Sequence, residues 1–486
     1  MEPNKKSINL SVLQDLFKNS ADVKFQKYTF QEQTIHLILC EGMIDQQLLN
    51  EVIVPRVGFL CSHLVDEPLE EQIISRLYVP DLKKVNEEEE AISLVYTGSV
   101  LLYFEEAALL FSSNVEKKPN RTPEETRTEI TVKGPRDNFI EDVSINIALL
   151  RKRLPTNSLS VEKFEVGKRS KTKVALLYFE DIANKEILNG IKEQIKKVDT
   201  DTVFSGDVFM ENINKSAVLF PRHEYTGRPD NTAQALSRGR FVIFVDGISY
   251  AIVLPVNLFL LLKTSEDNEY PPLFSSIERI MRIFGTLVAT FLPAFWLSLT
   301  TFHQNQIPFQ LLATVVQANT GLPLPTALEM FLMLGTFELF REAGLRLPTV
   351  LGGTIGVVGG LIIGDAVIRG GMTSATMVVI MATSTIASFT LVNQSIVTAV
   401  SVLRIFSIIL STFFGLFGFF ASVFFILIYL SKIRIFGVPY MNIATELNWT
   451  TIAKSLFRLP SKKYSKRPSM LKTQDDTRRK EVKKDE

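Results

Sequence analysis

Glycine recurs at every fourth position through an apolar stretch that follows about 280 residues of mixed polar and apolar sequence. In a bilayer, lipid tails compete with side chains for apolar contacts, so helices associate where small residues let their backbones approach closely. The pattern predicts a membrane helix with a bare ridge, which suits either a ring of identical helices or close packing within the chain's own bundle. The ridge consists of Gly352, Gly356, Gly360 and Gly364, and Gly353 and Gly359 widen it to a second face.

Four segments are apolar over the roughly 20 residues that a membrane-spanning helix requires. They are residues 282–302, 349–368, 372–392 and 405–430. An even number of crossings leaves both ends of the chain on one side of the membrane. The tail after Leu430 carries 14 Lys or Arg against 6 Asp or Glu, and basic flanks stay in the cytoplasm. The first 26 residues do not resemble a secretory leader, so we expect both termini in the cytosol.

Two further apolar segments are not predicted to span. Asp246-Gly247 divides residues 241–262 into two short β-rich halves, which is a hairpin signal. Residues 326–340 contain Glu329 and Glu338, whose charges are costly at the bilayer midplane unless they face a cavity or a partner. We predict sheet for the first segment, and for the second an interfacial or re-entrant helix near 326–344, outside the membrane's cytoplasmic face.

The formal net charge of +1 conceals two parts of opposite sign. The residues before Met281 carry 34 basic and 42 acidic groups, whereas the tail has an excess of 8 basic groups. An acidic soluble half argues against a nucleic-acid-binding protein. The tail is expected either to be solvated and disordered or to lie on anionic lipid headgroups.

The soluble half contains an internal repeat. Residues 35–52 match residues 174–191, and residues 97–111 match residues 238–252, with offsets of 139 and 141 residues. Each first match is an apolar strand that turns into a helix, and each second match contains a glycine, Gly98 or Gly239, before another strand. The nearly constant offset predicts two α/β subdomains of related plan.

The predicted fold class is an α/β cytosolic region of two related subdomains, followed by an all-α multi-span membrane domain. Apolar residues at helical spacing in 139–154 predict a helix that bridges the two subdomains. The predicted boundaries are an N-terminal tail at 1–30, a first α/β subdomain at 31–118, a loop and bridging helix at 119–154, a second α/β subdomain at 155–280, a membrane domain with about four spanning helices at 281–431, and a basic cytosolic tail at 432–486.

Few residues suggest catalysis or metal binding. Cys40 and Cys61 are the only cysteines, and in the reducing cytosol both are expected as free thiols. With His36 and His63 they supply four metal-type ligands, but the spacing is not that of a usual structural zinc site. No glycine-rich phosphate loop and no nucleophile elbow is present in the sequence. We therefore predict no enzyme, no cofactor and no metal.

Charged residues near the predicted spans are better candidates for function. The segment FELFREAGLRLP contains Glu338, Arg341, Glu342 and Arg346, which either form ion pairs that set helix docking or make a solvated interfacial face. Asp365 follows the last glycine of the ridge, with Arg369 one turn later. An ionisable residue at that position is a functional candidate by default, although a simple surface pair is the alternative.

Five ordered motifs between about Gln33 and Leu430 resemble the A subunits of the GerA-type spore germinant receptors of endospore-forming bacteria. They are residues 134–136 followed by FIEDVSINIALLRKR, the segment PRHEYTGRPD at 221–230, residues 239–240 with Val245-Asp246-Gly247, FELFREAGLRLP at 337–348, and the glycine-rich residues 352–371. Each motif is weak alone, but their order makes the resemblance specific.

The resemblance implies a subunit of a nutrient-sensing receptor in the spore inner membrane, which acts with a transporter-like B subunit and a lipoprotein C subunit. It also implies a homo-oligomer, expected to be a pentamer, that forms a nutrient-gated ion channel. The alternatives from other classes are a non-conducting membrane scaffold and an accessory subunit of a solute transporter.

Within that picture, the glycine-ridged helix is expected to surround a central path. Val350, Ile355, Val357 and Ile362 would narrow the path, because a dry apolar constriction can close a channel by dewetting. In the soluble half, Arg136, Arg228 and Asp230 are predicted to form a contact between subdomains or subunits, with a turn-stabilising ion pair as the alternative for the last two.

Overall fold

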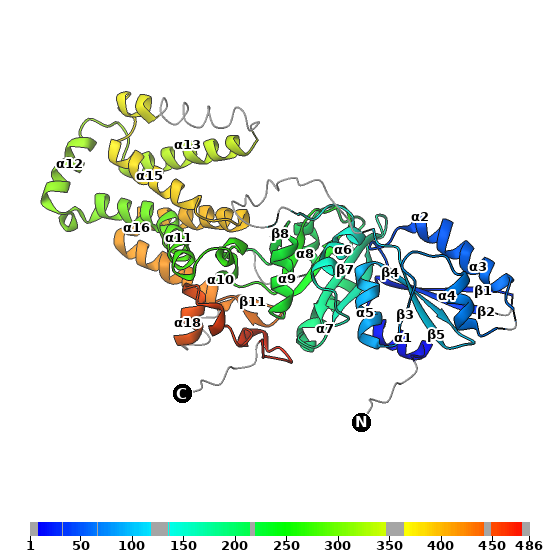
Figure 1. Ribbon diagram of the computed structural model, residues 1–486. Helices are drawn as coiled ribbons and strands as arrows, with labels where there is room; N and C mark the ends of the chain where they lie inside the picture. Colours follow the sequence, from blue (N-terminus) through cyan, green and yellow to red (C-terminus); the bar gives the residue numbers. More distant parts are fainter. Residues whose placement is uncertain are drawn as a thin grey trace, which may run out of the picture.

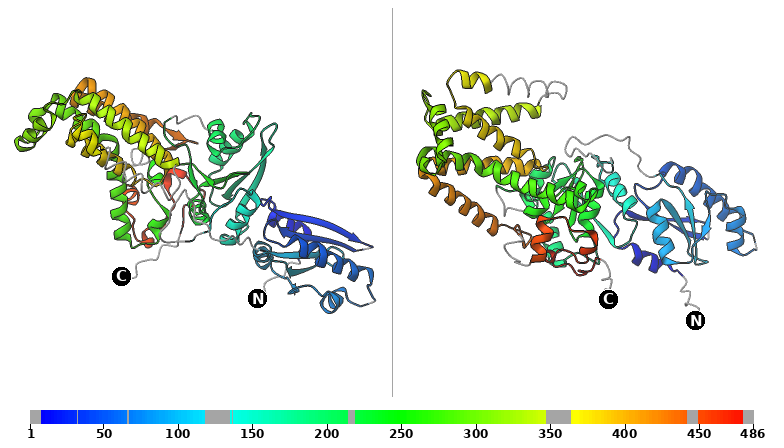
Figure 2. Two further views of the ribbon diagram at one scale, coloured as in Figure 1. Left: turned by 90° about the horizontal axis from the view of Figure 1, so that it is seen from above. Right: turned by 60° about the vertical axis from the view of Figure 1, so that its left-hand side comes forward.

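The computed structural model describes residues 8–31, 33–65, 67–117, 135, 137–213, 219–346, 364–441 and 449–478 of the 486-residue chain. Two sheet domains and a helical region follow one another in space (Figure 1). In both views of Figure 2 the helices lie on the side of the second sheet that faces away from the first sheet. The second sheet domain therefore separates the first from the helices.

The first domain is built on an antiparallel sheet of five strands in the order β1-β2-β4-β5-β3. Alternate residues of β2 enter different cores, with Leu37 and Leu39 on one face and Ile38 and Cys40 on the other, as the two-residue period of a strand requires. Both faces are covered by helices. The elements are α1 (Leu10–Phe17), β1 (Val23–Phe30), β2 (Gln33–Cys40), α2 (Gln46–Leu48), the π-helical turn Leu49–Ile53, α3 (Val54–Ser62), α4 (Leu69–Arg76), β3 (Lys83–Lys84), α5 (Glu88–Thr97), β4 (Ser99–Phe104) and β5 (Leu109–Asn114).

The second domain repeats this arrangement with the strand order β6-β7-β9-β10-β8. Its sheet is also antiparallel and is buried between two cores. The elements are α6 (Val143–Arg153), β6 (Leu159–Val166), β7 (Thr172–Phe179), α7 (Lys185–Lys196), α8 (Gly206–Ile213), β8 (Glu224–Thr226), α9 (Pro229–Ser237), β9 (Phe241–Val245), β10 (Ala251–Leu254) and α10 (Leu258–Leu261).

The segments that match in sequence occupy equivalent places in the two sheets. The first match falls on β2 and β7, and the second falls on β4 and β9. Gly98 and Gly239, which end the preceding helices, have positive φ angles of 103° and 86°, a conformation that glycine adopts at little cost. The hairpin predicted at Asp246-Gly247 is confirmed, because β9 and β10 pair there as antiparallel strands.

Helix α6 joins the two sheet domains. Its residue Arg151 is completely buried and pairs with Asp22 of the first domain through Nε–Oδ2 and Nη2–Oδ1 distances of 2.8 and 2.9 Å. The guanidinium carbon lies 4.1 Å from the centre of the Tyr96 ring. A bidentate, fully desolvated pair of this kind fixes orientation as well as adding energy. On the other side, Ile147 and Leu150 of the same helix pack in the core of the second domain.

The helical region begins with α11 and folds into a bundle. Met330, Met333 and Leu334 of α13 pack against Ala294 and Leu297 of α11 in one core, together with residues of α15 and α16. The segment near 326–344, predicted as an interfacial or re-entrant helix, packs beside the helix of the first predicted span, and its position relative to the membrane stays a prediction. The elements are α11 (Pro272–Phe302), α12 (Phe309–Asn319), α13 (Thr326–Arg346), α15 (Ala375–Ser388) and α16 (Gln394–Lys432), and residues 364–369 are also helical.

Gly415 breaks α16, so the predicted fourth span at 405–430 is not one straight helix. Its φ of 58° and ψ of −136° are non-helical and are available to glycine almost alone. Ile396 and Leu403 before the break lie in one core with Ile426 and Leu430 after it, although a straight helix would place Ile396 and Leu430 about 50 Å apart. The two arms, 394–414 and 416–432, therefore fold back on each other as a helical hairpin.

The number of membrane crossings stays a prediction. Among the described residues, α11 and α16 are long and apolar enough to be candidate spans, although Gly415 divides α16 into two shorter arms. Helix α15 covers only 14 residues of the predicted third span, about 21 Å of helix against a hydrocarbon core of about 30 Å. The predicted second span at 349–368 lies mostly outside the described residues.

The basic tail is folded back onto the second sheet domain, in contrast to the solvated or lipid-bound tail that its charge suggested. It contains a small hairpin, β11 (Arg434–Ile435) with β12 (Val438–Pro439), and the helix α18 (Trp449–Leu456). Leu471 is completely buried in a core of the second sheet domain, and Gln474 N donates to the Ile182 carbonyl at 3.0 Å. Charge composition could not reveal these contacts, because they are made by backbone and apolar groups.

We predict that Gly415→Ala lowers the stability of the purified protein by about 1–3 kcal/mol, because an alanine there would adopt a strained backbone conformation. Its Cβ would also meet Phe302 Cβ at 3.0 Å. Thermal unfolding in detergent measures the effect. The control is Gly335→Ala in α13, where an added Cβ meets nothing within 4 Å and alanine is the better helix former. Equal unfolding temperatures for the two variants would contradict the hairpin.

Candidate functional site at the domain–helix junction

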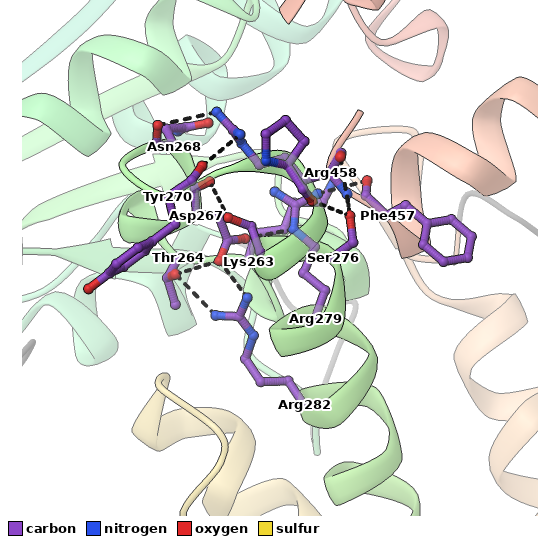
Figure 3. A network of polar contacts seen from close by, with 12 residues as sticks. Lys263, Thr264, Asp267, Asn268, Tyr270, Ser276, Arg279, Arg282, Phe457 and Arg458 are labelled. Carbon is purple, nitrogen blue, oxygen red and sulfur yellow. Dashed lines mark hydrogen bonds and ion pairs between the residues drawn. The ribbon is translucent and has the colours of Figure 1, made fainter. Parts of the chain in front are cut away.

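The chain leaves the second sheet domain through a short 3₁₀ turn, Ser265–Asn268. Asp267 in this turn is completely buried, and two arginines of α11 donate to its carboxylate. Arg279 Nε lies 2.6 Å from Oδ2, and Arg282 Nη2 lies 2.5 Å from Oδ1. Figure 3 shows both guanidinium groups reaching from the helix toward this carboxylate. The end of the sheet domain is therefore tied to the first turns of α11.

Neighbouring hydroxyl groups complete the shell around Asp267. Thr264 Oγ1 donates to Oδ1 at 2.9 Å, and Ser275 Oγ donates to the Asp267 backbone carbonyl at 2.8 Å. Burial alone would raise the pKa of Asp267, but the charges of Arg282 and Arg279 outweigh it and hold the pKa below its usual value. Asp267 is thus an ionised, fully desolvated anchor at neutral pH.

The tail is the third partner in the junction. Arg279 Nη1 donates to the Phe457 carbonyl at 3.0 Å. The backbone N–H of Arg458 donates to Ser276 Oγ at 3.0 Å, and its Nη1 donates to the Tyr270 carbonyl at 2.9 Å. These contacts, drawn in Figure 3, come from segments about 180 residues apart in the chain. A movement of any one part strains the other two.

A second polar cluster lies inside the helical bundle and centres on Arg404 of α16. Its Nη2 lies 2.5 Å from Glu338 Oε1 of α13, and its Nη1 donates to Ser384 Oγ of α15 at 3.1 Å. Arg341 Nη2 lies 2.6 Å from the other oxygen of Glu338, and Arg341 Nη1 donates to Ser401 Oγ. Arg404 is 2% exposed. One buried cation therefore connects three helices.

Glu329 supports the neighbouring end of α15. Its Oε1 accepts from Thr373 Oγ1, Ser374 N and Ser374 Oγ at 2.6, 2.5 and 2.8 Å. A carboxylate at a helix N-terminus is favoured by the unpaired N–H groups and by the helix dipole. Both glutamates of α13 that are costly in an apolar layer thus have polar partners.

Residues 11–470 match the family model described as Bacillus/Clostridium GerA spore germination protein. The chain belongs to this family.

Individual relatives match over nearly the whole chain. Spore germination protein XA of Bacillus anthracis is 38% identical over 480 residues, which are 97% of this chain and 97% of that relative. The uncharacterized membrane protein YfkQ of Bacillus subtilis (strain 168) is 29% identical over 470 residues, 96% of this chain and 91% of that relative. The crystal structure of the N-terminal domain of the A subunit of the Bacillus megaterium spore germinant receptor GerK3 aligns with 20% identity and a TM-score of 0.40, over 52% of this chain and 97% of that chain. The family resemblance carried by the five motifs is confirmed.

The structure brings only some of the predicted site residues of this GerA-family chain together. Glu338 and Arg341 form the ion pair that their spacing allowed, and Glu342 is exposed. Asp365 and Arg369 form an exposed pair at 2.8 Å. Outside the described residues lie Arg136, Val350, Gly352, Gly353, Ile355, Gly356, Val357, Gly359, Gly360 and Ile362, together with the side chain of Arg346. Gly364 is helical.

Arg228 and Asp230 form a bidentate pair within one turn, with Nε–Oδ1 and Nη2–Oδ2 distances of 2.9 and 2.8 Å. This pair is the turn-stabilising alternative that the sequence analysis gave for these two residues. The preceding Gly227 carbonyl accepts from Phe139 N at 2.8 Å, at the approach to α6. A subunit contact through this turn stays a prediction.

Both cysteines of this GerA-family chain are free thiols, as expected in a reducing compartment. Burial raises the pKa of Cys61 to about 11 and that of Cys40 well above its usual value. His36, which the sequence grouped with them as a weak metal pattern, instead contacts Glu105 at 3.0 Å through Nε2. The thiols are therefore packing groups of the first sheet domain.

Sequence reasoning missed Asp267 and Arg404. The predicted first span begins at Arg282, and the predicted fourth span begins just after Arg404. Both arginines therefore marked the ends of apolar segments, and the sequence did not show which acidic residues they pair with. The available signal for Asp267 was the pair of arginines three residues apart at the start of α11, with several acidic residues, Asp267 among them, shortly before them.

We predict that Asp267→Asn destabilises the protein by about 3–5 kcal/mol, because it leaves two buried arginines without their shared counter-charge. Thermal unfolding of the purified full chain measures the effect. The matched control is Asp199→Asn, since Asp199 is 74% exposed in a surface pair with Lys168, and such pairs contribute about 0–1 kcal/mol. A loss no larger than that of the control would show that the junction is not a structural anchor.

The same anchor makes a prediction about pH. Because the folded state holds the pKa of Asp267 below its unfolded value, the stabilisation is fully present above about pH 4 and is lost as the pH falls through the lowered pKa. The difference in unfolding temperature between wild type and Asp267→Asn should be constant near neutrality and should shrink below about pH 4. A difference that stays constant throughout the acid range would assign the stabilisation to packing instead.

Proposed function

We propose that this chain is a subunit of a nutrient-sensing germinant receptor in the spore inner membrane, acting with a transporter-like B subunit and a lipoprotein C subunit. The observation that carries this proposal is the family match along residues 11–470, which includes both sheet domains, the helices and most of the tail. Spore germination protein XA of Bacillus anthracis shares 38% of the aligned residues with this chain. In this role the chain transmits nutrient sensing by the receptor to the start of germination.

The proposal includes a homo-oligomer, expected as a pentamer, in which the helical region forms a nutrient-gated ion channel. The exposed side chains of the hairpin arms support a lipid or subunit contact, because Phe413, Phe417 and Phe420 are 71%, 76% and 64% exposed. Apolar patches of this kind mark membrane or protein interfaces. The glycine ridge from Gly352 to Gly364 would supply the close approach between copies.

Gating would use the junction at Asp267. A nutrient signal shifts the receptor only if it favours one arrangement of the parts over another. Asp267 connects the sheet domain, α11 and the tail, so α11 would move together with the sheet domain when that domain rotates. Arg404 would pass the movement on to α13 and α15.

The channel is tested by reconstituting the purified full chain in lipid and measuring its native mass and its ion conductance. We predict that Gly356→Leu and Gly360→Leu abolish ring assembly or conductance, because a leucine side chain prevents close helix approach. The control is Gly335→Leu, at a helical position where an added Cβ meets nothing within 4 Å. Normal assembly and conductance in both ridge variants would overturn the pore assignment.

Two other outcomes would select the alternatives. A monomer that does not conduct but is still required for germination would indicate a non-conducting scaffold. Saturable uptake of a solute that depends on this chain would indicate an accessory subunit of a transporter.

A further inference from the structure

A cavity of about 530 Å³ lies where the second sheet domain, the start of α11 and the tail meet. Nine Lys or Arg residues line it, and none of the described lining residues is Asp or Glu. Three of the cations come from the sheet domain and the loop after it, one comes from α11, and five come from the tail. Pockets of about 300–1,000 Å³ are typical of small-molecule sites.

Several of these cations already have partners. Arg279 pairs with Asp267, and Arg458 donates to backbone carbonyls. Arg467 pairs with Asp475, and Lys466 pairs with Asp476. These groups define the walls of the cavity, so the case for a ligand rests on the remaining ones.

Arg240 is the decisive residue. It is 3% exposed, and its Nη2 donates to Asn257 Oδ1 at 3.0 Å. Its Nε and Nη1 are buried and have no hydrogen-bond partner in the described part of the chain. A buried donor without a partner carries a desolvation penalty of about 1–3 kcal/mol, and more when the group is charged. Native proteins rarely leave such groups unsatisfied.

Arg238 and Lys263 line the same cavity as Arg240. Burial lowers the pKa of Arg240 to about 10, and burial together with repulsion from Arg279, Arg238 and Arg240 lowers the pKa of Lys263 well below its usual value. The buried acid Glu224 interacts electrostatically with Arg240 but is not among the residues that line the cavity, and burial raises its pKa. The cluster lacks negative charge on its open side.

We propose that this cavity binds a phosphate-bearing organic anion with at least two negative charges. Guanidinium groups present paired N–H donors that match phosphate oxygens, and here they converge from separate segments, which suits a tetrahedral group better than a planar carboxylate. Phe259, Leu260 and Tyr464 supply an apolar part of the lining for the organic portion. The phosphate belongs either to a soluble phosphate ester or to a phospholipid headgroup.

Because of where the cavity lies, a bound ligand would affect the contacts between the tail, α11 and the sheet domain. Arg279 belongs both to the cavity wall and to the Asp267 junction. Lys263 Nζ donates to the Lys454 carbonyl of α18 at 3.2 Å, so the ligand would hold the tail helix against the sheet domain. The site does not depend on the proposed germination role, because binding is measured without it.

The test uses the purified full chain with two kinds of probe. The soluble probes are inorganic pyrophosphate and adenosine triphosphate, measured by titration calorimetry. The lipid probe is binding to phosphatidylcholine vesicles with and without phosphatidic acid. The variants are Arg240→Gln and Arg238→Gln. The second keeps the test usable if the first fails to fold, since within the described part of the chain the Arg238 side chain makes a long hydrogen bond of 3.4 Å to Gln234. The control is Arg169→Gln, because the Arg169 side chain is 81% exposed.

We expect the wild type and the control to bind a probe, and each cavity variant to bind it at least about tenfold more weakly, the effect of one lost charge-assisted hydrogen bond. Weakened binding of the soluble probes identifies a soluble phosphate ester. Binding of phosphatidic acid vesicles alone, with the same dependence on Arg238 and Arg240, identifies a lipid headgroup. The proposal is overturned if neither probe binds, or if the cavity variants bind as tightly as the control.

Discussion

The buried carboxylate of Asp267 is the interaction on which the arrangement of this molecule depends. It is the shared counter-charge of two arginines of α11, while its own turn ends the sheet domain. Removing a carboxylate and two guanidinium groups from water is costly, and the cost is recovered only when all three keep the geometry that pairs them. The start of α11 is therefore held at a defined angle to the second sheet. The tail contributes the Phe457 carbonyl, which accepts a hydrogen bond from Arg279. This hydrogen bond forms only while the pair between Arg279 and Asp267 holds the arginine in place.

The same device appears at the other two joints. Arg151 pairs with Asp22 where the two sheet domains meet, and Arg404 pairs with Glu338 where three helices meet. At each joint a buried arginine from one element pairs with an acidic residue from another. In all three the donor is a planar guanidinium group, which requires a particular orientation of its partner. Apolar packing alone would tolerate sliding between such surfaces. Buried ion pairs contribute less to stability than to the choice of one arrangement, which is what a chain of connected domains needs in order to transmit a movement.

The sequence predicted the shared plan of the two sheet domains because its signals are local, but it assigned α1 and β1 of the first domain to an N-terminal tail at 1–30. The repeat was visible in strands whose residues alternate between two cores, in Gly98 and Gly239 before equivalent strands, and in the Asp246-Gly247 turn. The helices were harder, since an apolar run has no pattern that marks its interior break. Gly415 resembles a small packing residue in sequence, and only its non-helical backbone angles and the common core of the two arms show that it turns the chain. The docking of the tail and the partners of Arg404 depend on contacts between distant segments, which composition cannot supply.

The cavity and the junction share a residue, and this has a consequence for how the parts communicate. Arg279 uses Nε for Asp267 and Nη1 for the Phe457 carbonyl, which leaves Nη2 as the donor that can turn to the cavity. An anion there would draw the guanidinium toward the tail while Asp267 holds it toward the sheet domain. The two attractions act on one planar group, so they cannot be changed independently. Binding of an anion in the cavity and the angle of α11 are then thermodynamically coupled, so a change in the occupancy of the cavity must shift the angle of α11.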